Sequence, residues 1–386
     1  MNEANVYADG FCTQFAKEGD LMEFLRNRMN HCKWLRKPTK ALRLIPMEDE
    51  KVKKAYAGLP QYEEILSDTK NHTQLMLKVP GTDFPGEYLP VRDCAIHTIL
   101  SRAGVKGDGL KRLDRKRYAR IVNMCLQTAK GLSLIRLSDG KVAAVHGGDV
   151  TDYKILNMEQ IFQETIFYRY KNYPGTKYIE ASGSYDHSSA TAMWELSGNP
   201  ELVDAYQSAL KQYGIKRQVY APALRLSTSD VAAKSVTISQ MLLCDSNNQV
   251  INLGDPIRIS HSGEADIEYF KEQLNQIYPR YKQAIENLEK LLEIPIEHPV
   301  NTMIGLINKL DIGKKIGSEA VDLFVAQSGE GPTNAHEIYY ALNEVLFFAA
   351  CRGSGNAQLL RLEEKLMRML KYDWSEFDVS GTVAWK

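Results

Sequence analysis

Histidines and carboxylates gather at three places in this chain where the sequence predicts bends or the ends of elements. One group surrounds a glycine bend, one ends a predicted strand and one precedes a long helix; the candidates are His146, Asp149, Asp186, His187, His261 and Glu264. Imidazole and carboxylate ligands that converge from loops suit a divalent ion, which can activate water or hold a phosphate. The alternative is that the histidines are structural and that Glu264 complements the positive start of the helix. Convergence of these side chains in the fold would distinguish the two interpretations.

Lysines and arginines form two dense clusters in the first third of the chain. Residues 26–43 contain seven basic residues and no acid, and residues 102–120 contain eight basic residues and two acids. Aromatic residues lie among them, and a further series from Tyr168 to Tyr178 alternates tyrosines with basic residues. Cations that neutralise phosphates, beside rings on which bases stack, are typical of proteins that bind single strands with little sequence preference. The residues predicted to bind nucleic acid are Arg26, Arg28, Lys33, Trp34, Arg36, Lys37, Lys40, Lys111, Arg112, Arg115, Lys116, Arg117, Arg120, Arg169 and Lys171.

These basic clusters have a second interpretation, in which they are solvated helix faces and the tyrosines are the edge of a core. The total charge does not distinguish between these two interpretations, because 48 Lys and Arg balance 48 Asp and Glu. The charge is segregated, however: residues 1–150 hold 25 basic against 18 acidic residues, and the remainder holds 23 against 30. A neutral protein can bind nucleic acid only through such segregation. Both interpretations therefore stay open.

No familiar catalytic motif accompanies these residues. The sequence has no G-x-x-x-x-G-K-[ST] phosphate loop, no H-E-x-x-H metal motif, no G-x-S-x-G nucleophile turn and no strand-coupled G-x-G-x-x-G. The segment from Ser227 to Asp230 could present donors to a phosphate, but a turn at a strand end explains the same residues. The sequence therefore identifies no catalytic residue, and no cofactor beyond the divalent metal considered above.

The elements that would position these residues begin with a hairpin and a helix between Leu132 and Tyr170. Apolar residues roughly alternate from Leu132 to Leu137, Ser138 to Lys141 supplies the turn, and Val142 to Val145 returns as the partner strand. After a polar bend, Asn157 caps a helix with apolar residues at helical spacing. Other helices are predicted at 91–103, 115–130 and 200–213, and other strands at 75–79, 177–185, 191–196, 217–227 and 235–243.

From Gly263 onward the sequence predicts helix nearly throughout. Apolar residues from Ile267 to Leu292 recur every three or four positions, and Pro279 predicts a kink or break within that stripe. We expect an α+β fold, with a central, mostly antiparallel sheet built from hairpins with interposed helices, followed by a C-terminal helical layer packed on it. The expected domains are a basic N-terminal helical region (1–89), a central α+β domain (90–262) and a C-terminal helical region (263–386).

Length and composition exclude several classes of protein. With 386 residues, 44% of them hydrophobic, the chain can bury a large core in two or three domains. No apolar run reaches the roughly 18 residues of a membrane span, and the first residues lack the regions of a signal peptide. Six scattered cysteines without a C-x-x-C pair predict reduced thiols. We expect a cytoplasmic protein without membrane contact.

The order of several segments resembles one known family. These segments are LPVRDCAIHTILSRAGV, LIRLSDGKVAAVHGG, YKILNMEQIF, LRLSTSDVAAKSVTI, PIRISH, IEHPVNTM and TNAHEIYYALNEVL, between Pro90 and Phe377. Together they are similar to the phage/plasmid-like family called domain of unknown function 932. In many members of that family an arginine follows the position of Val142 to Ala144, where this chain has alanines. The resemblance implies a protein of a prophage or plasmid and specifies no reaction.

Three functions are compatible with these observations. The first is a nucleic-acid-binding protein of a mobile element, acting on single strands in replication, recombination or maintenance. The second is a metal-dependent enzyme that acts on nucleic acid or nucleotides through the histidine and carboxylate groups. The third is a protein-interaction factor, for example one that blocks a host defence through the acidic C-terminal helices. Assembly of copies of this chain into a homo-oligomer is also compatible with the sequence.

Overall fold

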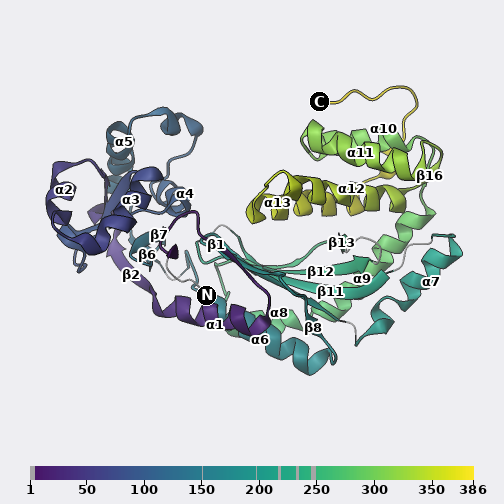
Figure 1. Cartoon of the computed structure of the whole chain (residues 1–386), viewed down its shortest axis with the longest axis horizontal. Helices are drawn as coiled ribbons and strands as arrows, with labels where there is room; N and C mark the ends of the chain where they lie inside the picture. The colour runs from purple at the N-terminus through teal and green to yellow at the C-terminus, as the bar shows by residue number, and fades with distance from the viewer. Residues whose placement is uncertain (1–4, 150, 197, 216–218, 232–233, 245–248) are drawn as a thin grey trace.

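The structure is a computed structural model that describes residues 5–149, 151–196, 198–215, 219–231, 234–244 and 249–386. The chain forms two bodies (Figure 1): a lobe of residues 32–147 at the left of the view, and a larger body built on an eight-stranded sheet. The expected α+β fold with a mostly antiparallel sheet is confirmed. Within the described ranges, no helix has both the length and the apolar character that crossing a membrane requires.

The lobe contains two small antiparallel sheets flanked by helices. The first has the order β2-β6-β7, with β2 (Cys32–Pro38), β6 (Leu132–Ser138) and β7 (Lys141–Gly147). The second has the order β3-β4-β5, with β3 (Arg43–Pro46), β4 (Leu75–Lys78) and β5 (Tyr88–Pro90), and a bridge between Val91 and Val142 joins the two sheets. The helices are α2 (Glu50–Tyr56), α3 (Glu63–Asn71), α4 (Asp93–Arg102) and α5 (Arg115–Thr128). Buried side chains of α4, α5 and these strands form a core that belongs to the lobe.

The β6-β7 hairpin forms as its sequence predicts. Asp139 (φ 49°) and Gly140 (φ 76°) occupy the two central positions of its turn, and both adopt the left-handed conformation that such a turn requires. Both strands are buried along almost their whole length. The lobe core covers Val142 and Val145, whereas Ala143 and Ala144 contact Val231 of the larger body. The hairpin therefore lies where the two bodies meet.

The larger body contains an eight-stranded antiparallel sheet with the main path β1-β9-β10-β11-β12-β13, to which β8 and β14 add at β10 and β12. The strands are β1 (Cys12–Phe15), β8 (Lys177–Tyr178), β9 (Gly183–Asp186), β10 (Ala190–Glu195), β11 (Val219–Thr228), β12 (Val236–Cys244), β13 (Gln249–Asn252) and β14 (Ile257–Ile259). Five helices pack with it: α1 (Glu18–Asn30), α6 (Met158–Asn172), α7 (Asp204–Gln212), α8 (Ile267–Leu274) and α9 (Ile277–Lys290). Figure 1 shows α1 and α6 along the lower side of the sheet.

The C-terminal helices form a layer above the sheet (Figure 1), as the sequence predicts. They are α10 (Pro299–Lys309), α11 (Lys314–Ser328), α12 (Ala335–Cys351) and α13 (Asn356–Met367), with a short pair β15 (Pro295–Ile296) and β16 (Thr333–Asn334). The apolar stripe from Phe270 to Leu288 is buried. The predicted break separates α8 from α9, so that Pro279 lies in the first turn of α9, where its missing N–H leaves no helical bond unmade.

Residues 1–89 differ from the helical region that the sequence predicts. They contain α1, α2 and α3 but also β1 to β4 and part of β5. The expected boundary between residues 89 and 90 falls inside β5, which pairs with β4. The sequence does not predict β2, because the charged residues of CKWLRKP hide its alternation and its partner β6 is far away along the chain.

Candidate nucleic-acid interface

The lobe concentrates the positive charge of a protein that is neutral overall. Residues 32–147 hold 22 Lys and Arg against 12 Asp and Glu. The fold therefore keeps the segregated charge in one body and does not spread it over the molecule. A ligand can use this charge only where the side chains are exposed and not already paired, so their individual positions matter.

Helix α5 turns part of this charge outward. The Asp114 side chain accepts the backbone N–H of Arg117 at 2.9 Å and caps the start of the helix. Helical spacing then separates two faces. The buried face carries Tyr118, Ala119, Val122 and Leu126. The exposed face carries Lys116, Arg117, Arg120 and Met124.

A hollow of about 430 Å³ lies between α5 and β3, and we call it the α5–β3 hollow. Asn123 fixes the two elements, because its side chain donates to the carbonyl of Leu44 and accepts the N–H of the same residue, at 2.7 Å each. Four cations and one carboxylate line the hollow: Lys51, Lys78, Lys116, Arg120 and Asp49. This excess of positive charge suits a phosphate group.

The cations of the α5–β3 hollow are available to a ligand. Among the residues that the structure describes, Lys51, Lys116 and Arg120 have no ion-pair partner, and all three are exposed. The ammonium of Lys78 lies 3.8 Å from Glu87, but both side chains are more than a third exposed, so solvent screens this pair. Met124, which is 62% exposed, adds apolar surface at the rim.

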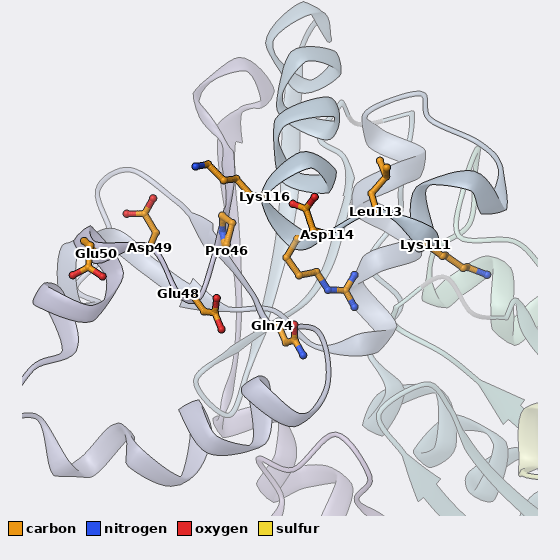
Figure 2. Close-up of a pocket in the computed structure, with 10 residues that line it drawn as sticks. Pro46, Glu48, Asp49, Glu50, Gln74, Lys111, Leu113, Asp114 and Lys116 are labelled. Atoms are coloured by element: carbon orange, nitrogen blue, oxygen red, sulfur yellow. The ribbon is translucent and has the colours of Figure 1, made fainter.

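A second pocket, of about 700 Å³, lies beside the hollow and shares Pro46, Asp49 and Lys116 with it. Figure 2 shows acidic residues from the start of α2 on one side of this pocket, and Lys111, Asp114 and Lys116 around the start of α5 on the other. Its charged lining consists of Glu48, Asp49, Glu50, Asp114, Lys111, Arg115 and Lys116. Carboxylates outnumber cations here. The smaller α5–β3 hollow, and not this pocket, therefore suits a phosphate.

The structure divides the residues predicted to bind nucleic acid into three groups. Exposed side chains are Arg26, Lys33, Arg36, Lys40, Lys111, Arg112, Lys116, Arg117, Arg120 and Lys171. Half-buried side chains are Trp34, Lys37 and Arg115. Arg28 and Arg169 are buried and form ion pairs with Asp139 and Glu18. The prediction is wrong for these two, because their charge is already neutralised inside the protein.

The predicted mixture of cations and stacking rings is not formed in the lobe. Tyr118 is only 3% exposed, and Trp34 lies under the guanidinium of Arg136, 6.0 Å from it. Tyr170 of the tyrosine series is 80% exposed on α6, and Phe167, which precedes the series on the same helix, is 64% exposed. α6 lies below the large sheet and outside the lobe (Figure 1). The lobe thus offers charge with little aromatic surface.

The second concentration of charged side chains lies between the lobe and the larger body, and we call it the joint. Arg136 of β6 pairs with Asp230, which follows β11, and the side chain of Arg136 is 5% exposed. The guanidinium of Arg92 lies 3.2 Å from Asp9 and 3.3 Å from Asp139. Lys141 pairs with Asp9 at 3.0 Å and also with Asp68. Each buried cation of the joint therefore faces at least one carboxylate.

The N-terminal segment holds the joint together. Asp9 accepts the backbone N–H of Asp93 at 2.8 Å in addition to its pairs with Arg92 and Lys141, so it binds the lobe. Two residues later, the ring of Phe11 packs on Phe24 at 6.1 Å, within the larger body. The same short segment thus contacts both bodies.

The six predicted metal ligands do not form one set in the joint. His146 and His261 lie on the two faces of Tyr153, with ring centres 3.8 Å and 5.1 Å from it and the rings nearly parallel. His187 contacts the carbonyl of Ala8 at 2.9 Å. Asp186 accepts the N–H groups of Ser188 and Ser189, and Asp149 and Glu264 are exposed. A stack of rings places the two histidines on opposite sides of a phenol and leaves no shared ligand position between them.

Burial controls the protonation of these histidines. It lowers the pKa of His146 to about 4 and also lowers the pKa values of His187 and His261. In the described part of the chain, the three ligand-type side chains that do lie close together are Asp9, Asp68 and His72. The carboxylates of Asp9 and Asp68 already pair with Lys141, so cations of the protein occupy the place of an ion.

Sequence reasoning missed two cations of the α5–β3 hollow, Lys51 and Lys78. Both lie outside the dense basic clusters, and the fold brings them to α5. Lys78 lies in the strand predicted at 75–79, but its position opposite Arg43 follows from the pairing of β3 with β4, which the sequence analysis did not predict. Nothing in the local sequence marks Lys51.

Comparison with protein-family models, curated proteins and solved structures gives no match for this chain. The resemblance to the phage/plasmid-like family therefore stays a prediction.

Proposed function

We propose that this protein binds single-stranded nucleic acid through the α5–β3 hollow and the exposed cations around it, in the replication, recombination or maintenance of a mobile element. The observation that carries the proposal is that four cations, Lys51, Lys78, Lys116 and Arg120, line the hollow together with a single carboxylate. Neutralising phosphates with such cations releases counterions from the nucleic acid, which supplies affinity without sequence readout.

The distribution of charge in the lobe favours contacts with the phosphate backbone of a nucleic acid over contacts that recognise its bases. The cations near the hollow are exposed, while the aromatic residues among them are covered. Arg36 in β2 and Lys40 in the turn that follows it are further exposed cations of the lobe. We therefore expect affinity with strong salt dependence and little preference for sequence. The two other functions, a metal-dependent enzyme and a protein-interaction factor, stay predictions that no site among the described residues supports. The cytoplasmic location also stays a prediction.

The proposal is tested by charge reversal in the hollow. Fluorescence anisotropy with a labelled oligothymidylate compares the full chain with the triple variant Lys51→Glu, Lys116→Glu and Arg120→Glu. Each phosphate contact changes the logarithm of the affinity by about 0.7 for a tenfold change in salt concentration. At 0.1 M salt, tenfold below 1 M, the loss of three contacts should therefore weaken binding by about a hundredfold. Lys51 and Lys116 lie in first helical turns, where glutamate is favourable, so the fold should persist.

A matched control removes the same charge elsewhere. The variant Lys282→Glu, Lys314→Glu and Lys315→Glu changes exposed lysines of α9 and α11, outside the lobe. It should bind within about threefold of the unchanged protein, because distant exposed charges are screened beyond roughly 10 Å at this salt. Equal losses of affinity in both triple variants would show that the net charge of the protein alone causes the effect. Absence of binding by the unchanged protein at low salt would refute the proposal.

A further inference from the structure

An irregular segment, residues 378–386, lies against α10 and α11, and we call it the strap. Figure 1 shows it as the yellow coil beside these two helices. The structure describes every residue of the strap, and its backbone forms neither helix nor strand. Its side chains are exposed except for Asp378, Val383 and Trp385, which are half-buried. Only Val383 and Trp385 among them reach the core of the larger body, so hydrogen bonds must do much to hold the strap in place.

Two asparagines of α10 bind the backbone of the strap. The side-chain amide of Asn301 donates to two of its carbonyls, at 2.7 Å and 2.8 Å. Asn308 lies seven residues later, on the same face of the helix. Its side chain donates to the carbonyl of Ala384 at 2.9 Å and accepts the backbone N–H of Lys386 at 3.0 Å. These contacts recognise main-chain groups, which every protein segment carries.

Two glycines make room for aromatic rings on these helices. A Cβ added to Gly317 of α11 would lie 3.2 Å from the ring of Trp385 and 2.7 Å from the side chain of Ile307. Gly317 therefore admits the indole and also lets α10 and α11 pack closely. A Cβ added to Gly305, inside α10, would lie 3.1 Å from the ring of Phe377, which precedes the strap. Glycine inside a helix lowers its stability relative to alanine, so its presence here fits a need for space.

The start of the strap is fixed separately from the rest of it. The Asp378 carboxylate accepts the backbone N–H groups of Glu297 and His298, at 2.9 Å and 2.7 Å, just before α10 begins. The remainder of the strap can leave while this contact persists. Asn301 and Asn308 are half-buried even with the strap in place, so water can solvate their amides when it leaves. Segments with few buried apolar contacts open at a low free energy.

We propose that this face of α10 and α11 is a peptide-binding site for a partner protein. The partner segment places a tryptophan where Trp385 lies and takes the place of the strap on Asn301 and Asn308. Hydrogen bonds to its backbone supply affinity, and the space beside Gly317 selects the indole. In the free protein the strap occupies the site and competes with the partner. The site lies outside the α5–β3 hollow and does not depend on the proposed nucleic-acid function.

The experiment measures binding of a labelled peptide with the strap sequence, DVSGTVAWK, blocked at both ends, to the full chain by fluorescence anisotropy. Trp385→Ala removes the ring of the competing strap. This variant should bind the peptide with a dissociation constant of about 0.1 mM, which is modest for a segment of this length. The tethered strap of the unchanged protein competes at an effective concentration of about 1 mM, so the unchanged protein should bind the peptide about tenfold more weakly.

A second variant loosens the strap without removing its ring. Gly381 has φ 88°, where a β-branched side chain is strained, and an added Cβ meets no atom within 4 Å. Gly381→Val should therefore increase peptide binding as Trp385→Ala does. Circular dichroism checks that both variants keep the fold, which is expected because neither change lies in α10 or α11.

Further changes locate the peptide on the site. In the Trp385→Ala chain, Asn308→Ala removes two hydrogen bonds and should weaken peptide binding by about tenfold. Asn172→Ala is the matched control, because the Asn172 amide also donates to a backbone carbonyl, that of Tyr168, but on α6. It should leave binding unchanged. A peptide with alanine in place of its tryptophan should bind at least about tenfold more weakly.

Four results would overturn the proposal. One is the absence of peptide binding by both strap variants up to about 2 mM, well above the expected dissociation constant. Another is equal binding by the unchanged protein and the two strap variants. The third is an equal effect of Asn308→Ala and Asn172→Ala. The fourth is a dimer of the unchanged protein, seen by light scattering, that dissociates in Trp385→Ala, because the strap of a second copy would then be the occupant.

Discussion

The α5–β3 hollow and the joint are built from the same residue types, yet their charges are used in opposite ways. In the hollow, Lys116 and Arg120 are exposed and have no ion-pair partner among the described residues. In the joint, Arg92, Arg136 and Lys141 are at most 5% exposed, and each faces a carboxylate. A basic segment therefore overstates the charge that a ligand meets, because part of it is neutralised inside the protein. Only the exposed remainder can attract nucleic acid.

The two regions also differ in how they respond to mutation. An exposed charge is well solvated, so its loss changes stability little but removes a contact for a ligand. A buried pair contributes little net stability against an apolar replacement, but removal of one partner leaves an uncompensated charge in a dry environment. Variants of the joint should consequently alter folding, and variants of the hollow should alter binding.

The largest effect is expected from Asp230→Ala in the joint. It leaves the guanidinium of Arg136 without its carboxylate, and we expect a loss of about 3–5 kcal/mol in the free energy of unfolding. Urea denaturation followed by circular dichroism measures it. Glu50→Ala is the exposed counterpart, since Glu50 pairs with Lys53 in solvent, and it should change the free energy of unfolding much less. Equal, small losses of unfolding free energy in both variants would show that water reaches the Arg136–Asp230 pair in the joint.

Acid should weaken the joint before it affects the hollow. Burial lowers the pKa of His146 from 6.5 to about 4, and those of His187 and His261 also fall, so the folded protein holds all three neutral. Their stabilising contribution is complete above pH 6.5. For His146 it decreases as the pH falls from 6.5 towards 4, by about 1.4 kcal/mol per pH unit, because the unfolded chain binds protons first. The lowered pKa values of His187 and His261 change stability in the same direction.

The histidine contribution is isolated with His146→Phe, which keeps a flat ring in the stack with Tyr153. Its unfolding free energy should depend on pH less steeply than that of the unchanged protein, by about 1.4 kcal/mol per pH unit between pH 6 and 4.5. Urea titrations at four pH values give both slopes. An unaltered slope would mean that His146 titrates normally and is not buried in the joint.

A smaller effect is expected from Tyr153→Phe. The Tyr153 hydroxyl is buried and has no hydrogen-bond partner among the described groups, whereas its ring packs between two imidazoles. Removing an unpartnered hydroxyl while keeping the ring should raise the unfolding free energy by up to about 1 kcal/mol. Thermal unfolding at pH 7.5 measures the change. A loss of stability in this variant would reveal a partner for the hydroxyl.

The parts of the fold that follow local rules could be predicted from the sequence. The turn at Asp139-Gly140 specifies the β6-β7 hairpin, and the Asp114 cap with the spacing of Tyr118, Val122 and Leu126 specifies α5. The predictions failed where distant segments meet. β2 becomes a strand only through β6, and Arg28 is buried only because Asp139 lies beside it in the folded protein.

The candidate site could likewise be predicted only where its residues lie close together in the sequence. Sequence spacing identified Lys116 and Arg120 as exposed cations of one helix, and the structure agrees. It could not place Lys51 and Lys78 beside them, because the α5–β3 hollow is assembled from four separate segments. The stack of His146, Tyr153 and His261 is likewise invisible along the chain, since it depends on where the lobe meets the larger body.

The salt dependence of binding tests the central claim most directly. The slope of log affinity against log salt, measured by anisotropy with oligothymidylate between about 50 and 200 mM salt, counts the phosphates that the protein neutralises. The triple variant of Lys51, Lys116 and Arg120 should reduce the magnitude of the slope by about 2, because each lost contact removes about 0.7. The control triple variant of Lys282, Lys314 and Lys315 should leave the slope unchanged, because these exposed lysines lie on α9 and α11, outside the lobe. An unchanged slope in the triple variant of Lys51, Lys116 and Arg120, or an equal reduction in the control variant, would contradict the account.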